Sequence, residues 1–146
     1  MRIILQRVSR ASVTIEDKVV GSIDSGYVLL VGFGPDDDEK NVSEMAEKVV
    51  NLRVMSDEEG RMNRSILDVR DSILVVSQFT LYADTSKGMR PYFGDAADPG
   101  MAEQLFDLFL KELKKYDVNV QSGQFGAMMQ VALVNDGPVT IILESR

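Results

Sequence analysis

The residues best able to do chemistry lie in two short polar segments. The first, residues 77–81, follows the apolar run at residues 73–76. Its two hydroxyls, one carboxamide and backbone amides could orient a carbonyl group and stabilise an oxyanion without an ionised base. The candidate catalytic residues here are Ser77, Gln78, Phe79 and Thr80. The alternative reading is a strand end whose polar side chains only satisfy backbone groups.

The second polar segment, residues 135–140, lies between two apolar runs. Asp-Gly between β-forming residues is a strong hairpin signal, and proline could set the edge of the following strand. On the residues alone, a hairpin turn is therefore the favoured interpretation. The bond between Gly137 and Pro138 is also a place for a cis peptide, because the cis form costs only about 0.5–1 kcal/mol before proline. A cis bond would point neighbouring carbonyl groups in unusual directions.

The sequence contains no histidine and no cysteine, and this excludes several mechanisms. A Ser-His-Asp triad, a Cys-His dyad and a His-ligated zinc centre are all impossible. Hydroxyls, carboxylates, backbone groups, ordered water and the substrate itself remain available. The acidic run at residues 36–39 could suggest Mg²⁺ or Ca²⁺, but it lacks the spacing of an EF-hand and also suits a helix start. We therefore predict no metal and no cofactor.

Length and composition predict a single domain over residues 1–146. With 45% apolar residues, a chain of this size can form a core without disulfides or metals. Its apolar runs are far shorter than the roughly 20 residues that span a bilayer, and the amino terminus lacks the run of a signal peptide. We therefore expect a cytoplasmic protein with no membrane role. The net charge of −7 argues against a broad nucleic-acid surface but leaves room for a small footprint on an RNA end.

Hydrophobic periodicity predicts the elements that position the two polar segments. Helical spacing indicates one helix at residues 39–52 and another up to residue 113, which Asp98 and Pro99 would begin. Strands are predicted on both sides of a turn at residues 16–18, at 27–33, around Val54, and at 73–79, 118–121, 128–134 and 139–143. About seven strands and two helices give an α/β domain with its helices on one side of a mixed sheet.

Together, the two polar segments resemble the signatures of the bacterial and eukaryotic D-aminoacyl-tRNA deacylase family. The matching strings are Ser-Gln-Phe-Thr-Leu at residues 77–81 and Asn-X-Gly-Pro-X-Thr at residues 135–140. The likeness covers essentially the whole chain, including residues 5–13, 51–53, 62–65 and 125–129. It implies a three-layer α/β/β domain with mixed, largely antiparallel sheets and two main helices, assembled as a homodimer.

The resemblance also implies a role in translation quality control. The protein would hydrolyse the ester that joins a D-amino acid, or glycine, to the terminal adenosine of tRNA, and would reject the L form. A cis Gly137–Pro138 peptide would enter the partner subunit's pocket as a chiral gate, with Arg7 holding it and Met129 flanking the pocket. The residues implied for substrate binding and the gate are Arg7, Met129, Asn135, Gly137, Pro138 and Thr140. Rigid backbone against the α-carbon would admit hydrogen but exclude an L side chain, so discrimination needs no attractive contact.

Two accounts of the chemical step compete. Thr80 could attack as a nucleophile, but the sequence offers no histidine or evident base to activate its hydroxyl. We favour substrate assistance, in which the terminal ribose 2′-hydroxyl positions or activates water. The amides near Phe79 and Thr80, with Ser77 or Gln78, would then stabilise the oxyanion.

Other functions stay open on the sequence alone. One is a non-catalytic module that binds an RNA end or an aminoacyl group. Another is an esterase with a different chirality preference. Ser86 and Met89 also occupy positions that are often basic in the family, so the grip on tRNA is either weaker or located elsewhere.

Overall fold

The structure is a computed structural model that describes residues 1–145. The strands are β1 (Arg2–Ile15), β2 (Lys18–Ile23), β3 (Gly26–Gly32), β4 (Met55–Ser56), β5 (Met62–Arg64), β6 (Ser72–Ser77), β7 (Asn119–Ser122) and β8 (Gln130–Glu144). The helices are α1 (Glu39–Asn51), α2 (Ile66–Val69), α3 (Pro99–Leu113) and the 3-10 helix η1 (Phe79–Tyr82). No helix in this part of the chain is long and apolar enough to cross a membrane.

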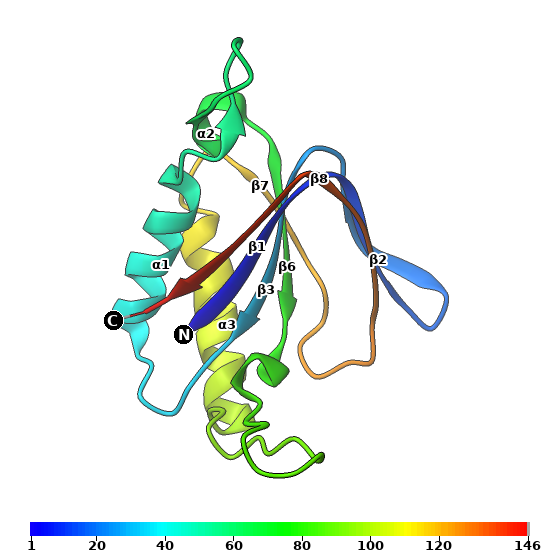
Figure 1. Cartoon of the computed structure of the whole chain (residues 1–146), viewed down its shortest axis with the longest axis vertical. Coiled ribbons are helices and arrows are strands. Elements are labelled where there is room, and N and C mark those ends of the chain that lie inside the picture. Colours follow the sequence, from blue (N-terminus) through cyan, green and yellow to red (C-terminus); the bar gives the residue numbers. More distant parts are fainter. Residues whose placement is uncertain (146) are drawn as a thin grey trace.

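The long strand β1 organises a six-stranded mixed sheet (Figure 1). On one side, β1 pairs antiparallel with β3 along its first half and with β2 along its second half. On its other side, β8 pairs with it over nearly its whole length. The sheet continues from β3 through β6 to β7 in parallel pairs, while β4 and β5 form a separate small hairpin.

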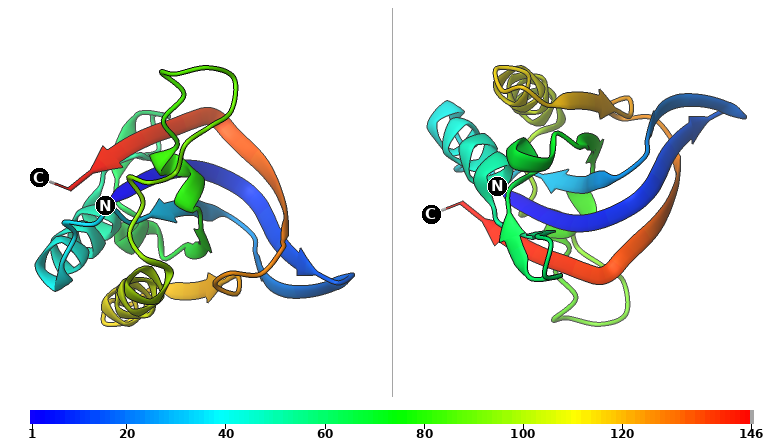
Figure 2. Two further views of the ribbon diagram at one scale, coloured as in Figure 1. Left: turned by 90° about the horizontal axis from the view of Figure 1, so that it is seen from below. Right: turned by 90° about the horizontal axis from the view of Figure 1, so that it is seen from above.

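The core has two parts, one on each face of the sheet. Along β6, Ile73 and Val75 belong to the larger part under α1 and α3, whereas Leu74 and Val76 belong to the smaller part. The second half of β1, with β2 and the start of β8, curls over this smaller part, as the end-on views show (Figure 2). The layers are therefore helices, sheet and curled strands, and the mixed α/β prediction is confirmed.

Helices α1 and α3 form where the periodicity predicts them. Asp38 caps α1 in a capping box with Asn41, and Asp98 caps α3 directly before Pro99. Both helices turn their apolar stripes to the same face of the sheet. The structure adds a third, single-turn helix, α2, which the hydrophobic periodicity does not predict.

Two details of the predicted strands are wrong. The strand predicted at residues 73–79 ends at Ser77, because Gln78 leaves the extended conformation and η1 begins. The hairpin predicted around Gly137 does not form, since β8 runs from Gln130 to Glu144 and both of its halves pair with β1. The segment is instead a wide bulge. Gln6 pairs with Thr140 and Val8 with Asn135, so residues 136–139 lie opposite the single residue 7.

Candidate active site

The segment Ser77–Thr80 lies where β6 ends against β3. The Gln78 amide donates to the Val31 carbonyl at 2.7 Å, and an added Cβ on Gly32 would lie 2.8 Å from the Gln78 carbonyl oxygen. The 3-10 turn then begins, with the Leu81 amide donating to the Gln78 carbonyl at 3.2 Å. The amides of Phe79 and Thr80 therefore stand at the start of a helix, where no intrahelical acceptor exists for them.

The side chains of this segment provide no base. The Gln78 carboxamide donates a hydrogen bond to the Thr80 hydroxyl. An amide nitrogen in this role cannot accept a proton, so this contact orients the Thr80 hydroxyl without activating it. The Phe79 ring is largely exposed beside them. The segment is equipped to position and polarise a carbonyl group rather than to attack it.

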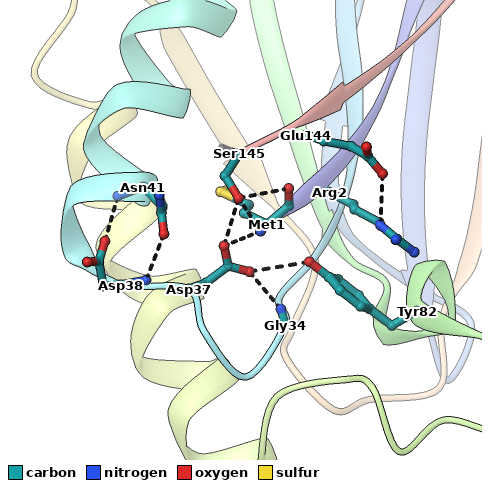
Figure 3. Close-up of polar contacts among 9 residues, drawn as sticks. All are labelled: Met1, Arg2, Gly34, Asp37, Asp38, Asn41, Tyr82, Glu144 and Ser145. Atoms are coloured by element: carbon teal, nitrogen blue, oxygen red, sulfur yellow. Dashed lines mark hydrogen bonds and ion pairs between the residues drawn. The ribbon is translucent and has the colours of Figure 1, made fainter.

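The far end of η1 is fixed by Arg2, at the start of β1, and by Asp37, just before α1 (Figure 3). The Tyr82 hydroxyl donates to an Asp37 carboxylate oxygen at 3.3 Å. Arg2 donates to the Leu81 carbonyl at 2.9 Å, and its guanidinium carbon lies 4.6 Å from the Tyr82 ring centroid. These contacts hold the turn that carries the candidate catalytic residues.

Asp37 is the buried centre of this polar cluster. Its carboxylate accepts hydrogen bonds from the Gly34 amide at 2.7 Å and the Ser145 hydroxyl at 2.8 Å, and it pairs with the amino terminus of Met1. Burial alone would raise the pKa of Asp37, but these hydrogen bonds and the ammonium charge hold it below its ordinary value. Burial, with Asp37 nearby, raises the pKa of Tyr82.

The acidic run at residues 36–39 thus has structural partners. Asp37 forms the buried cluster and Asp38 caps α1. Among residues 1–145, no three acidic side chains converge in a way that would hold a metal ion.

We expect Asp37→Asn to lower the free energy of unfolding by about 3 kcal/mol at neutral pH, because it leaves a buried ammonium without its counter-charge. The depressed pKa of Asp37 gives stability that is complete above its ordinary pKa of 3.8 and is lost as the pH falls through the folded-state value. Urea titrations from neutral to acid pH would measure this. The exposed neighbour Asp36→Asn is the control, and equal stability of the two variants would contradict the account.

The second polar segment forms an exposed loop on the bulge of β8. The Gly137–Pro138 peptide is cis, and Gly137 has a φ of +123°. The Asn135 carboxamide closes the base of the loop, donating to the Arg7 carbonyl at 2.9 Å and the Val139 carbonyl at 3.0 Å. The Thr140 hydroxyl lies 3.4 Å from the Asn135 side-chain oxygen. We call residues 135–140 the gate loop.

Arg7 joins the gate loop to the β4–β5 hairpin. Its Nε donates to the Asp136 carbonyl at 3.2 Å, and its Nη1 donates to the Val54 carbonyl at 2.8 Å and the Ser56 hydroxyl at 3.3 Å. An added Cβ on Gly137 would lie 3.0 Å from Nη2 of Arg7. The loop is therefore fixed by a planar cation that contacts it from one side.

One chain does not bring the two polar segments together. In the sheet, Arg7 lies opposite Tyr27, which lies opposite Ile73, so Ser77 is four residues further along β6. That offset is about 13 Å along β6. The three strand spacings from β8 through β1 and β3 to β6 add about 14 Å across the sheet. Met129 is also remote from its own gate loop. It packs on the smaller core part.

The outer side of β8 forms a surface that the motifs and periodicity of the sequence do not predict. This strand pairs only with β1, so its other edge has no partner strand among residues 1–145. Its exposed apolar side chains include Val131, Val134 and Ile142, the last of them 68% exposed. A long, apolar and unpaired edge is typical of a surface that associates with another chain. The signal for it in the sequence is the pair of apolar runs at residues 131–134 and 141–143, on either side of the gate loop.

Comparisons with known proteins point to one family. A family profile described as D-Tyr-tRNA(Tyr) deacylase matches residues 4–144. A protein of Roseiflexus sp. (strain RS-1) named D-aminoacyl-tRNA deacylase is 58% identical over 145 residues, covering 99% of this chain and 94% of that protein. A protein of Bacillus mycoides (strain KBAB4) with the same name is 53% identical over 146 residues and covers 100% of both.

Two solved structures are similar as well. One is described as a c-Myc DNA Unwinding Element Binding Protein, with 42% identity, a TM-score of 0.94, and coverage of 100% of this chain and 99% of that chain. The other is described as a probable eukaryotic D-amino acid tRNA deacylase. It has 17% identity and a TM-score of 0.85 over 97% of each chain, and it shows the fold alone.

The mixed α/β fold and the full-length relatives named as deacylases define the chain as a hydrolase. The chain belongs to the D-Tyr-tRNA(Tyr) deacylase family. The family resemblance predicted from the sequence is thereby confirmed.

Proposed function

We propose that the protein hydrolyses the ester bond of D-aminoacyl-tRNA, releasing the free D-amino acid and tRNA, and rejects L-aminoacyl-tRNA. The observation that carries this proposal is the exposed gate loop, whose Gly137–Pro138 backbone is fixed by Arg7 and Asn135. A backbone surface fixed in this way can exclude an L side chain by contact with the α-carbon. Glycyl-tRNA has no side chain to exclude, so we expect it to be cleaved too.

We propose that the working form is a homodimer in which each gate loop completes the partner subunit's site. The separation of the gate loop from Ser77–Thr80 within one chain supports this arrangement. So does the unpaired apolar edge of β8, the strand that carries the gate loop. The protein would act in the cytoplasm, where aminoacyl-tRNA is made and used.

For the chemical step, we propose attack by water rather than by the protein. The water oxygen bonds to the ester carbonyl carbon, and the bond from that carbon to the ribose 3′ oxygen breaks. The water proton passes by way of the ribose 2′-hydroxyl to the departing 3′ oxygen, so no protein base is required. The amides of Phe79 and Thr80 stabilise the oxyanion that forms between these events. No metal takes part.

Thr80→Ala is expected to keep its turnover number within about tenfold of wild type, because the amide remains and the hydroxyl is held by a carboxamide rather than a base. Single-turnover hydrolysis of D-tyrosyl-tRNA with acid quench would measure the rate and reveal any acyl-enzyme. A trapped acyl-enzyme in wild type, with near-complete loss in the variant, would establish Thr80 as the nucleophile.

The competing function is binding of a nucleic-acid end without turnover. One similar solved structure carries the name of a DNA-element binding protein, whereas this chain has a net charge of −7. Incubating the purified protein with matched D- and L-tyrosyl-tRNA, with and without a chelator, would separate the two functions. Chelator-resistant release of D-tyrosine alone is the expected result, and tight binding with no release of either amino acid would favour the binding module.

A further inference from the structure

Exposed aromatic side chains lie in the candidate catalytic segment and in the loop that follows it. Phe79 is 58%, Tyr92 62% and Phe93 36% exposed. The rings of Phe79 and Phe93 meet edge to face, with centroids 5.2 Å apart and an interplanar angle of 67°. We call Phe79 and Phe93 the aromatic patch. Gathered exposed aromatic rings are typical of a binding surface, and the proposed chemical step uses none of these rings.

The patch stands on a braced loop. Asp84 and Tyr92 pair through both backbone amides, at 2.8 and 2.9 Å. The Tyr92 ring lies so close over Gly94 that an added Cβ there would be 1.9 Å from the tyrosine oxygen. The Ala96 amide donates to the Phe93 carbonyl at 3.1 Å, which closes the turn after the patch. These contacts hold the backbone that carries Phe93 in place before any ligand arrives.

The position and charge of the loop suit an RNA end. The loop begins directly after η1, and it lies on the side of the sheet away from α1 and α3, where β8 also runs (Figure 2). Lys87 and Arg90 are exposed on the same loop, although the chain as a whole is acidic. Two cations on a loop that also carries exposed aromatic residues match the phosphates and bases of single-stranded RNA.

We propose that the aromatic patch binds, by base stacking, the unpaired nucleotides that precede the terminal adenosine of the substrate. This inference rests on the proposed function. If the ester is held at Ser77–Thr80, the terminal adenosine that carries it lies at this segment, and the nucleotides before that adenosine lie beside the loop. Aromatic faces stack with any base, so the patch would serve every tRNA alike. Lys87 and Arg90 would lie near the connecting phosphates.

The test compares Phe93→Ala with wild type on two substrates, D-tyrosyl-tRNA and the truncated ester D-tyrosyl-adenosine. We expect kcat/KM on the tRNA to fall about tenfold, mainly through KM, which is the low end for one stacked base. On D-tyrosyl-adenosine the variant should equal wild type. Met89→Ala changes a fully exposed, non-aromatic residue of the same loop and should leave both substrates unaffected.

Two results would overturn the inference while leaving the proposed function intact. Equal losses on both substrates would mean that Phe93 only supports Phe79 in the catalytic segment, and no loss on either would mean that the patch binds nothing. If wild type cleaves neither ester, the proposed function fails and the patch is tested alone. The anisotropy of a labelled RNA oligonucleotide ending in CCA then decides, since an unchanged Kd for Phe93→Ala overturns the patch and a raised Kd supports it.

Discussion

Gly137→Ala is expected to lose at least about 100-fold of the preference for D- over L-tyrosyl-tRNA, or about 2.7 kcal/mol of discrimination. The φ of +123° at Gly137 is unfavourable for alanine. The new Cβ would also lie 2.8 Å from Cγ2 of Val139 and 3.0 Å from Nη2 of Arg7. Val139 belongs to the gate loop and Arg7 holds it, so the loop must move. Steric exclusion depends directly on where that backbone lies, so its displacement admits the L side chain.

Gly60→Ala is the matched control for this substitution. Gly60 also has a positive φ, +76°, but an added Cβ there meets nothing within 4 Å. It therefore carries a similar backbone cost without touching the gate loop. Arg7→Lys offers a second route, because lysine keeps the charge but loses the planar fork that contacts Asp136, Val54 and Ser56. If both gate variants discriminate as wild type does, the gate loop is not the chiral filter.

Phe79→Pro is expected to reduce kcat by about 10²–10³-fold, the usual loss when one oxyanion donor is removed. Proline deletes the Phe79 amide N–H at the first position of η1, where no helical bond is broken. Gln78 before it is outside the helical region, with φ −146° and ψ 76°, so proline avoids the clash that it makes with a helical preceding residue. The loss should therefore appear in the rate and not in stability.

Phe79→Ala is the control that separates the amide from the ring. It keeps the N–H and removes the aromatic side chain, so its kcat should stay near that of wild type. The comparison requires single-turnover rates on D-tyrosyl-adenosine, which avoids any contribution from the rest of the tRNA. Equal kcat for the alanine and proline variants would show that the Phe79 amide does not stabilise the transition state.

The helices could be predicted from the sequence because their signals are local. In α1, apolar residues at helical spacing follow a capping box at Asp38, and in α3 they follow Asp98 and Pro99. The course of β8 could not be predicted, because the pairing that overrides the Asp-Gly hairpin signal comes from β1, more than 100 residues away. The side chain of Asn135, which closes the bulge on Arg7, depends on the same distant strand.

The polar motifs of the site could be predicted, but their support could not. Residues 77–80 and 135–140 are recognisable as chemistry in the sequence. Asp37, by contrast, looks like one member of a solvated acidic run and is buried only because Met1 and Ser145 meet it from opposite ends of the chain. Tyr82 likewise depends on this distant contact, because its hydroxyl donates a hydrogen bond to the buried Asp37.

A mixed dimer tests the central claim, a chiral gate supplied across subunits, most directly. One subunit carries Phe79→Pro and the other Gly137→Ala, with different tags so that only mixed dimers are purified. The one site with an intact catalytic segment then lies on the Gly137→Ala chain and receives its gate loop from the Phe79→Pro chain. Cross-subunit gating predicts that this dimer cleaves D-tyrosyl-tRNA at about half the wild-type rate, with the full wild-type preference for D over L. A dimer with the relaxed preference of Gly137→Ala would contradict it and place the gate within each chain.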